Sequence, residues 1–322
     1  MNPKFKSFME ALPSGKIAVA LSGGADSMAL LYWCRAFDLD ITALTVDHGL
    51  RPESGAEAEF AKRAAESLGI PHHILKWDGE KPSSGVEEAA RAARYGLMLD
   101  FCRKNSIGIL MTAHHADDNI ETFLMNLGRG SGLFGLAGIR QVSEMEGITV
   151  IRPLLEVRRA EILGWCAANG VEFADDPMNG DERFLRVRVR KNRGLLKDKL
   201  DIPDERILSA ISALDRARAA MEQSIDDLMF RVKINEQRIE FTADFLFGLP
   251  EEIRLKFLSR ALQEVGGEKY PPRLDGVRRA LGELDRDTTL TLAHCAVRRL
   301  GNKMLVVPEG SRVSFSTKKE TT

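Results

Sequence analysis

A loop that contains two adjacent glycines and two hydroxyl side chains lies near the start of the chain. It consists of Ser22, Gly23, Gly24, Ala25, Asp26 and Ser27, and it follows the apolar residues 17–21. Because glycine has no Cβ atom, backbone N–H groups in such a loop can close on an anion. A helix that begins at Ser27 adds the positive end of its dipole at the same place. The loop is therefore predicted to bind phosphate.

Asp26 distinguishes this loop from the Walker A loop. The Walker A pattern requires Gly-x-x-x-x-Gly-Lys-Ser/Thr, and here no lysine precedes Ser27. A carboxylate repels a polyphosphate unless a cation lies between them, so Asp26 is predicted to hold Mg²⁺ on a pyrophosphate group. The alternative is a simple Gly-Gly turn in which Asp26 and Ser27 cap the helix.

Two histidines and three carboxylates form a second candidate site after the apolar residues 107–112. If a helix starts near Ala116, Asp118 and Glu121 share one face, and His115 meets Asp118 in the first turn. Such a cluster could bind Mg²⁺ or a substrate ammonium group, whereas acids at a helix start are also ordinary partners of the helix dipole. The cluster contains His114, His115, Asp117, Asp118 and Glu121.

Two more motifs are candidates for the same site. Asp47 and His48 precede a glycine and form either a simple turn or part of a nucleotide site. Arg91 and Arg94 lie on a predicted helix, where a forked guanidinium suits a phosphate or a carboxylate. The alternative for these arginines is a solvated helix face that includes a salt bridge to Glu87.

A basic run lies further along the chain. Between residues 181 and 199 the acidic residues are Asp181, Glu182 and Asp198. The run can offset several phosphates of a nucleic-acid backbone, although a solvated helix face is the usual meaning of such a run. The residues that we expect to contact substrate are Arg183, Arg186, Arg188, Arg190, Lys191 and Arg193.

The elements that must position these residues alternate between strands and helices. Apolar and patterned segments predict strands at 17–21, 41–46, 73–77 and 107–112, and helices at 57–68, 86–105 and 157–169. This alternation indicates an α/β fold with a doubly wound parallel sheet. Ligands of such sheets bind past the carboxyl ends of the strands, which is where the candidate motifs fall.

Two domains and a connecting helix are predicted. Residues 1–200 form the catalytic domain, and residues 201–233 form a helical linker because apolar residues recur there at spacings of three and four. Residues 234–322 form a small α/β domain. Its expected elements are strands near 239–241, 289–291 and 304–307 and a helix at 251–265.

Composition limits the class of protein. The 322 residues are 44% hydrophobic and 29% charged, which is typical of a soluble chain with a full core. The net charge of −1 argues against a uniformly basic nucleic-acid binder. The four cysteines lie far apart without a Cys-x-x-Cys motif, so the sequence encodes neither a zinc knuckle nor a redox pair. We expect a cytoplasmic protein, since no apolar stretch is of membrane length.

The 22–27 loop resembles the PP-loop of the N-type ATP pyrophosphatases, whose pattern is Ser-Gly-Gly-x-Asp-Ser. The resemblance implies an adenine nucleotide alpha hydrolase-like fold. It also implies an enzyme that cleaves ATP to AMP and pyrophosphate while it activates a substrate as its adenylate. The implied ATP contacts are the 22–27 loop with Asp47 and His48, and the implied Mg²⁺ ligand is Asp26.

Later motifs resemble, in the same order, those of the tRNA(Ile)-lysidine synthetase family. They are Val46-Asp47-His48-Gly49-Leu50-Arg51, Ala92-Ala93-Arg94-Tyr95, Ala113-His114-His115 with Asp118 and Glu121-Thr122, the glycine-rich residues 129–136, and Ile151-Arg152-Pro153-Leu154-Leu155. The resemblance implies an ATP-dependent ligase that forms a carbon–nitrogen bond. Its substrates are ATP, L-lysine and an isoleucine tRNA with a CAU anticodon.

In that family the wobble cytidine is adenylated and the side-chain amine of lysine then displaces AMP. Resemblance and chemistry together make Asp26, His115, Asp118 and Glu121 the candidate catalytic residues. The division of roles among the last three stays open. The small C-terminal domain would help to dock the tRNA.

Two functions of other classes also stay open. A PP-loop thiolase would share the ATP loop, but such enzymes commonly need paired cysteines, and this sequence supplies no evident pair. A non-catalytic nucleotide- or tRNA-binding module would explain the loop and the basic run, and it would make the histidine and carboxylate cluster incidental. The sequence does not fix the oligomeric state, and a homodimer is one arrangement that it allows.

Overall fold

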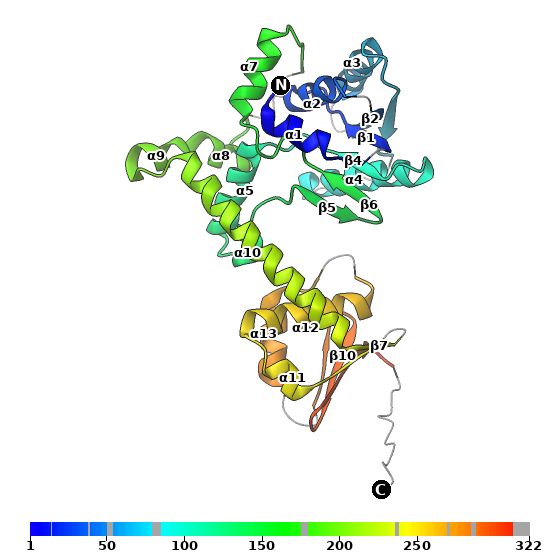
Figure 1. Ribbon diagram of the computed structural model, residues 1–322, viewed down its shortest axis with the longest axis vertical. Helices are drawn as coiled ribbons and strands as arrows, with labels where there is room; N and C mark the ends of the chain where they lie inside the picture. Colours follow the sequence, from blue (N-terminus) through cyan, green and yellow to red (C-terminus); the bar gives the residue numbers. More distant parts are fainter. Residues whose placement is uncertain are drawn as a thin grey trace. The chain divides into compact units, whose positions relative to one another are not determined.

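The computed structural model describes residues 1–13, 15–37, 39–49, 54–78, 85–174, 180–235, 238–268, 271–284 and 288–311. The chain divides into two compact units, Met1–Asp215 and Arg216–Thr322. Figure 1 shows the first unit in blue to green and the second in yellow to orange-red. The boundary lies within the long helix α10 (Asp204–Arg231), so the domain limits at residues 200 and 233 stay predictions.

A six-stranded sheet forms the centre of the first unit. Its strand order is β3-β2-β1-β4-β6-β5, and every neighbouring pair is parallel except β5 with β6. The strands are β1 (Lys16–Ala20), β2 (Asp40–Asp47), β3 (His72–Lys76), β4 (Ile109–Met111), β5 (Val142–Met145) and β6 (Ile148–Ile151).

Strand β1 lies between β2 and β4 and is buried on both faces. Ile17, Ala18 and Val19 each have 0% of their surface exposed. Ile17 is in register with Ile41 of β2 and with Ile109 of β4. A strand that is covered on both faces must be apolar at every position, which explains why this segment does not alternate. The predicted doubly wound parallel sheet is confirmed.

Helices cover both faces of this sheet (Figure 1). One apolar cluster packs Phe5, Leu31 and Ile162 against one face, and a second cluster packs Met98 and Leu99 of α4 against the other. The helices are α1 (Pro3–Glu10), α2 (Ala25–Cys34), α3 (Ser54–Ser67), α4 (Val86–Lys104), α5 (Ala116–Gly128), α6 (Leu133–Leu136) and α7 (Arg159–Ala168).

The antiparallel strand β5 is an element that the sequence did not predict. It turns into β6 through Glu146 and Gly147, whose φ angles are 53° and 78°. Two successive residues with positive φ are typical of a type I′ hairpin turn, which favours glycine at its second position. Gly147 was therefore a signal for a hairpin at the edge of the sheet.

Two short helices and the start of α10 follow in the first unit. They are α8 (Leu185–Asn192) and α9 (Gly194–Leu200). Ile207 and Ile211 of α10 pack on Ile120 of α5 in a separate apolar cluster. Because Ile120 lies between Asp118 and Glu121 in the sequence, this packing anchors the helix that carries the candidate carboxylates.

The second unit contains a five-stranded antiparallel sheet of order β7-β8-β11-β10-β9. The predicted strands and the predicted helix at 251–265 are present, whereas β7, α11, α13 and β10 were not predicted. Gly276 and Gly282 lower the helix propensity of α13, and β10 contains two adjacent arginines, Arg298 and Arg299, and lacks a clear alternation. The elements are β7 (Lys233–Asn235), β8 (Arg238–Thr242), α11 (Ala243–Phe247), α12 (Glu251–Gly266), α13 (Leu274–Glu283), β9 (Thr289–Leu292), β10 (Cys295–Leu300) and β11 (Lys303–Pro308).

None of the helices among the described residues combines the length and the apolar character that crossing a bilayer requires.

Candidate active site

The 22–27 loop connects β1 to α2, and Ser27 closes it. The Ser27 hydroxyl accepts a hydrogen bond from the Ser22 backbone N–H at 3.1 Å and donates to the Gly24 carbonyl at 2.9 Å. Helix α2 begins at Ala25 and not at Ser27 as predicted, because Gly24 takes the N-cap position. Asp26 consequently lies in the first turn of the helix.

The two glycines leave the loop backbone open to a ligand. Gly23 has a φ of +82°, a conformation that side chains rarely adopt, and a Cβ there would lie 3.5 Å from Phe60 Cδ1. Gly24, the N-cap of α2, provides no side-chain capping bond. The first N–H groups of α2 are therefore available to an anion, as the sequence predicted.

A hydrogen-bonded pair that the sequence did not single out supports the end of β1. Thr45 of β2 donates its hydroxyl proton to the Leu21 carbonyl at 2.6 Å, immediately before the loop. The same hydroxyl lies 2.8 Å from His72 Nε2 on β3. Because the Thr45 hydroxyl hydrogen is already used in the bond to Leu21, the Thr45 oxygen accepts the second hydrogen bond and His72 donates it from Nε2. Burial, with the charge of His73, lowers the pKa of His72 to about 4, which keeps the imidazole neutral.

Replacing Thr45 with valine is expected to raise the KM for ATP and to lower stability by about 1–3 kcal/mol. The change leaves the Leu21 carbonyl and His72 Nε2 without their partner, and the loop then starts from a less fixed strand. Steady-state pyrophosphate release and urea unfolding measure the two effects. Thr45→Ser restores the hydroxyl and should restore both values. An unchanged KM for ATP in Thr45→Val would refute the supporting role.

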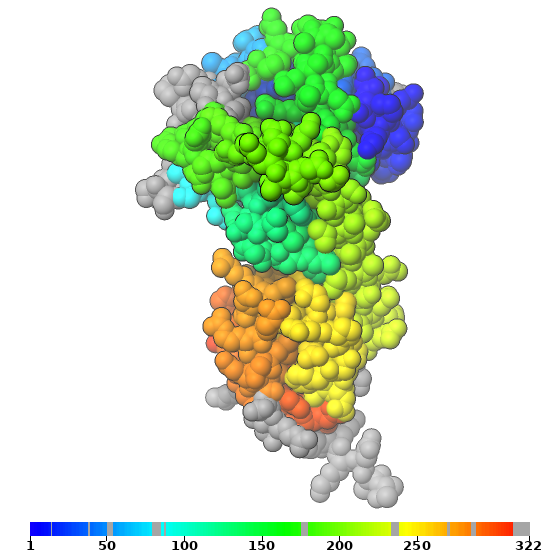
Figure 2. Space-filling view, turned by 90° about the vertical axis from the view of Figure 1, so that its left-hand side faces the viewer, coloured from blue at the N-terminus to red at the C-terminus, as the bar shows by residue number. Residues whose placement is uncertain are grey.

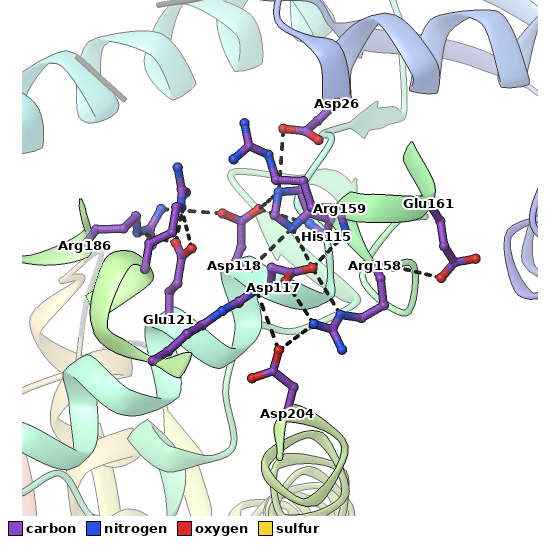
Figure 3. A network of polar contacts seen from close by, with 12 residues as sticks. Asp26, His115, Asp117, Asp118, Glu121, Arg158, Arg159, Glu161, Arg186 and Asp204 are labelled. Carbon is purple, nitrogen blue, oxygen red and sulfur yellow. Dashed lines mark hydrogen bonds and ion pairs between the residues drawn. The ribbon is translucent and has the colours of Figure 1, made fainter. Parts of the chain in front are cut away.

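Asp26 meets the histidine and carboxylate cluster across the carboxyl ends of β1 and β4 (Figure 3). Asp26 Oδ2 lies 3.6 Å from His115 Nε2, and Asp118 Oδ2 lies 3.5 Å from the same nitrogen. The imidazole therefore contacts two carboxylates that are 92 positions apart in the sequence. They come together because β1 and β4 are neighbours in the sheet. The 22–27 loop and the α5 cluster therefore lie together at one edge of the sheet, as predicted.

His115 is the N-cap of α5 and is 2% exposed. Its Nδ1 accepts a hydrogen bond from the Asp118 N–H at 3.2 Å, and Asp118 Oδ2 accepts one from the His115 N–H at 3.0 Å. Since Nδ1 is an acceptor, the neutral ring carries its proton on Nε2, which faces Asp26. Burial lowers the pKa of His115, but Asp26, Asp118 and Asp117 outweigh this and raise it.

His114 belongs to the predicted cluster but was not named among the catalytic candidates. Its Nδ1 lies 2.9 Å from the Thr112 hydroxyl. Burial lowers the pKa of His114 to about 3, although the Asp118 charge acts in the opposite direction and Arg91 and Arg186 add to the lowering. The ring is neutral at pH 7 and lies within electrostatic reach of Asp118. The sequence signal for His114 was its place beside His115. In the structure the two rings have different partners, Thr112 for His114 and Asp118 for His115.

The basic run folds back on the acids of α5. Glu121 is fully buried and receives two hydrogen bonds from Arg190, Nε to Oε1 at 2.7 Å and Nη2 to Oε2 at 3.1 Å. Arg186 lies 3.8 Å from Glu121 and 4.0 Å from Asp118. Asp118 and Glu121, which were predicted to share one helix face, both lie near Arg186, and Arg190 neutralises Glu121.

Asp117 forms a second set of charged contacts beside the first (Figure 3). Its carboxylate is 6% exposed and accepts from the Arg158 guanidinium, the Arg159 backbone N–H at 2.8 Å and Arg193 Nη2. Burial raises the pKa of Asp117, but these donors lower it well below its usual range. Arg158 also contacts Asp204 of α10 at 2.5 Å, so α10 is joined to the same network of charges.

Other residues of the basic run pair within their own turn. Arg183 hydrogen-bonds to Asp181, Arg188 to the carbonyls of Glu182 and Arg183, and Lys191 Nζ lies 2.7 Å from Glu182. Contact of Arg183, Arg188 and Lys191 with a nucleic acid stays a prediction.

The second pair of predicted motifs lies at the end of β2. Asp47 Oδ1 accepts from the Ser54 hydroxyl at 2.7 Å and from the Gly49 N–H at 2.9 Å, and these bonds lower the pKa of Asp47. Arg94 Nε lies 3.3 Å from His48 Nε2. Asp47 thus shapes the turn, as one of its two interpretations proposed, and ATP contact by Asp47 and His48 stays a prediction.

Arg91 lies near the same edge of the sheet. Its guanidinium stacks 5.2 Å from the centre of the Tyr95 ring, one turn further along α4. This stacking leaves the charge of Arg91 close enough to lower the pKa of His114. Substrate contact by Arg91 and Arg94 stays a prediction.

Asp26 has capacity for one further partner. Its Oδ1 is buried and has no hydrogen-bond partner among the described residues, while its Oδ2 faces His115. The same residues contain no group of three or more His, Cys, Asp or Glu that could hold a metal by themselves. Magnesium is usually bound through one or two carboxylates together with substrate phosphates. A carboxylate with a free oxygen at a phosphate loop fits that manner of binding.

Comparison with known proteins gives the family. A family model described as a PP-loop domain matches residues 1–195. A tRNA(Ile)-lysidine synthase of Methylobacterium sp. (strain 4-46) is 38% identical over 93% of this chain and 90% of its own length. The chain belongs to the tRNA(Ile)-lysidine synthase family. The tRNA(Ile)-lysidine synthase of Wolbachia pipientis wMel is 35% identical over 95% of this chain and 74% of its own length.

A solved structure agrees with the fold of this lysidine synthase family member. It is the U34-tRNA thiolase NcsA from Methanococcus maripaludis with its [4Fe-4S] cluster, with a TM-score of 0.57 and 18% identity over 66% of this chain and 77% of that chain. The matched PP-loop domain and this likeness together support an adenine nucleotide alpha hydrolase-like fold. The four cysteines here, Cys34, Cys102, Cys166 and Cys295, are buried and unpaired.

Proposed function

We propose that this chain forms lysidine on an isoleucine tRNA. It adenylates the wobble cytidine with ATP and then joins L-lysine to the activated base, releasing AMP and pyrophosphate. The observation that carries the proposal is that the ATP loop and the α5 cluster lie together. Asp26 and Asp118 both contact Nε2 of His115. A module that only binds a nucleotide does not require this arrangement.

The first step makes a poor electrophile reactive. The C2 carbonyl oxygen of cytidine attacks the α-phosphorus of ATP, and the bond to the pyrophosphate oxygen breaks. The backbone N–H groups of the 22–27 loop and the first turn of α2 bind the phosphates and stabilise the developing charge. Asp26 would hold Mg²⁺ through its free oxygen, and the ion would neutralise the departing pyrophosphate.

The second step forms the carbon–nitrogen bond. The neutral side-chain amine of lysine attacks C2, and the C2 oxygen leaves with AMP while the nitrogen loses a proton. Asp118 is the carboxylate best placed to hold this amine, because Glu121 already receives two hydrogen bonds from Arg190. Asp118 is 14% exposed, and the arginine near it, Arg186, is 4.0 Å from its carboxylate.

The three residues of the cluster divide the work as follows. His115 caps α5 and orients the carboxylates of Asp26 and Asp118 through its two nitrogens. Asp118 binds the ammonium group of lysine and takes up the proton. Glu121, with Arg190, sets the charge balance of the pocket next to Asp118. We further propose that the tRNA has a CAU anticodon, that the metal is Mg²⁺, and that the enzyme works in the cytoplasm.

The test is pyrophosphate release from ATP by the purified chain, with and without L-lysine and isoleucine tRNA, together with incorporation of radioactive lysine into the RNA. Release and incorporation that both require isoleucine tRNA support the proposal. Release without lysine incorporation would move the chemistry to another nucleophile, such as the sulfur donor of a thiolase. No release under any condition would favour a binding module.

A further inference from the structure

A cavity of about 470 Å³ lies beside the active site in the first unit. It is bounded by α8, α9 and the start of α10, with Arg158 from the segment before α7. The yellow-green stretch that contains α9 and the start of α10 lies on the face shown in Figure 2. A volume of this size is in the range of ligand sites, which is roughly 300–1,000 Å³.

The charges that line the cavity favour an anion. Its basic side chains outnumber its two acids, Asp204 and Glu205, and are Arg158, Arg190, Lys191, Arg193 and Lys197. Both acids are already engaged, since Asp204 contacts Arg158 and Arg193 and Glu205 contacts Arg158. A cationic ligand would have to break these pairs, whereas an anion would not.

Two donors in the lining have unused capacity. The Lys197 ammonium forms no ion pair or hydrogen bond with any of the residues that the structure describes. Arg193 Nη2 binds Asp117, but its Nη1 is buried and has no hydrogen-bond partner within the same described ranges. Arg158 and Arg193 are held in place by Asp117, so their guanidinium groups are oriented before any ligand arrives.

Arg190 connects this cavity to the catalytic carboxylates. It lines the cavity, and its guanidinium also binds Glu121 through two hydrogen bonds. An anion in the cavity therefore lies one side chain away from the place where lysine reacts. A phosphate of the RNA strand that carries the reacting base satisfies this requirement, because nucleotides next to that base must pass close to the site.

We propose that this cavity binds a backbone phosphate of the substrate RNA, with Lys197 as its point-charge contact. The proposal rests on the function proposed above. A phosphodiester carries one negative charge and is positioned well by fixed guanidinium groups beside a mobile ammonium. The contact would set the register of the RNA strand and would carry no base preference of its own.

The experiment compares Lys197→Ala with Lys199→Ala. Both residues are exposed lysines of α9, but Lys199 does not line the cavity. Binding of isoleucine tRNA is measured by fluorescence anisotropy across a salt series. Loss of one phosphate contact is expected to weaken binding several-fold and to reduce the salt slope by about one. Lys199→Ala should change both values much less, and neither variant should change the KM for lysine.

Three outcomes would overturn the proposal. The first is an equal effect of the two variants on tRNA binding, and the second is an unchanged tRNA affinity in Lys197→Ala. The third is a raised KM for lysine with normal tRNA affinity in Lys197→Ala, which would assign the cavity to the lysine carboxylate. Lysidine formation by the wild-type chain is measured first. Its absence would refute the proposed function and would be distinct from a failure of the phosphate site alone.

Discussion

Replacing Asp26 with asparagine should reduce lysidine formation by at least about 100-fold. Asparagine keeps the size of the side chain but removes the charge that would hold Mg²⁺ against the pyrophosphate. It also removes the negative partner of His115 Nε2 at 3.6 Å. Because Asp26 is 28% exposed and its Oδ1 has no hydrogen-bond partner among the described residues, the fold should be retained.

Two measurements separate loss of metal binding from loss of the fold. Thermal denaturation with ATP is recorded with and without Mg²⁺, and the Mg²⁺-dependent part of the stabilisation should disappear in Asp26→Asn. Affinity for isoleucine tRNA should stay close to the wild-type value. The exposed Asp40 provides a control, since Asp40→Asn removes one charge from the same unit away from the loop. Full turnover in Asp26→Asn would contradict the assigned role.

Replacing Glu121 with glutamine should destabilise the chain by about 3 kcal/mol and raise the KM for lysine about tenfold or more. Glu121 is fully buried, and its loss leaves Arg190 without its charged partner. The destabilisation falls at the lower end of the usual range for a broken buried pair, because Arg190 is 25% exposed. The KM rises because the charge balance beside Asp118 shifts toward the positive.

A double variant tests whether Glu121 acts through the charge balance of the pocket. Glu121→Gln with Arg190→Gln removes both charges of the pair, so most of the lost stability should return. The KM for lysine, measured at saturating tRNA, should also return toward the wild-type value, because the net charge beside Asp118 is restored. A KM that stays high while stability returns would contradict the charge-balance role. The surface pair of Arg103 and Glu146 provides a control, since Glu146→Gln should cost less than about 1 kcal/mol.

The parts of the site that the sequence predicted are those encoded by neighbouring residues. The 22–27 loop follows a strand that is apolar throughout, and His115 and Asp118 have the spacing of a cap and its partner in the first turn of a helix. Parallel strands place their carboxyl ends at one edge, so the two motifs could be expected to meet without knowledge of the intervening chain.

The parts that could not be predicted depend on how distant elements pack. Arg190 and Glu121 are 69 positions apart, and no local pattern shows that a basic helix will lie on an acidic one. The run of basic residues indicated contact with phosphates, but five of its side chains pair with acids of their own chain, either in α5 or in their own turn. The pairing of Thr45 with His72 is equally non-local, because it depends on the register between β2 and β3.

The choice between two adjacent histidines shows another limit. His114 and His115 have the same chemistry and the same neighbours in sequence, but backbone geometry gives one the N-cap of α5 and the other a bond to Thr112. The sequence prediction placed both in the cluster but named only His115 as a catalytic candidate. In the structure both lie near Asp118, with the pKa of His114 lowered and that of His115 raised.

The double use of His115 limits which amino acids this position can accept during evolution. The ring caps α5 with Nδ1 and reaches Asp26 with Nε2. Asparagine or serine would cap the helix equally well, but their side chains are too short to reach the second carboxylate. Glutamine is long enough to reach it but is a poor cap. Each single replacement therefore keeps at most one of the two contacts, and changes at this position would require a compensating change on the loop side.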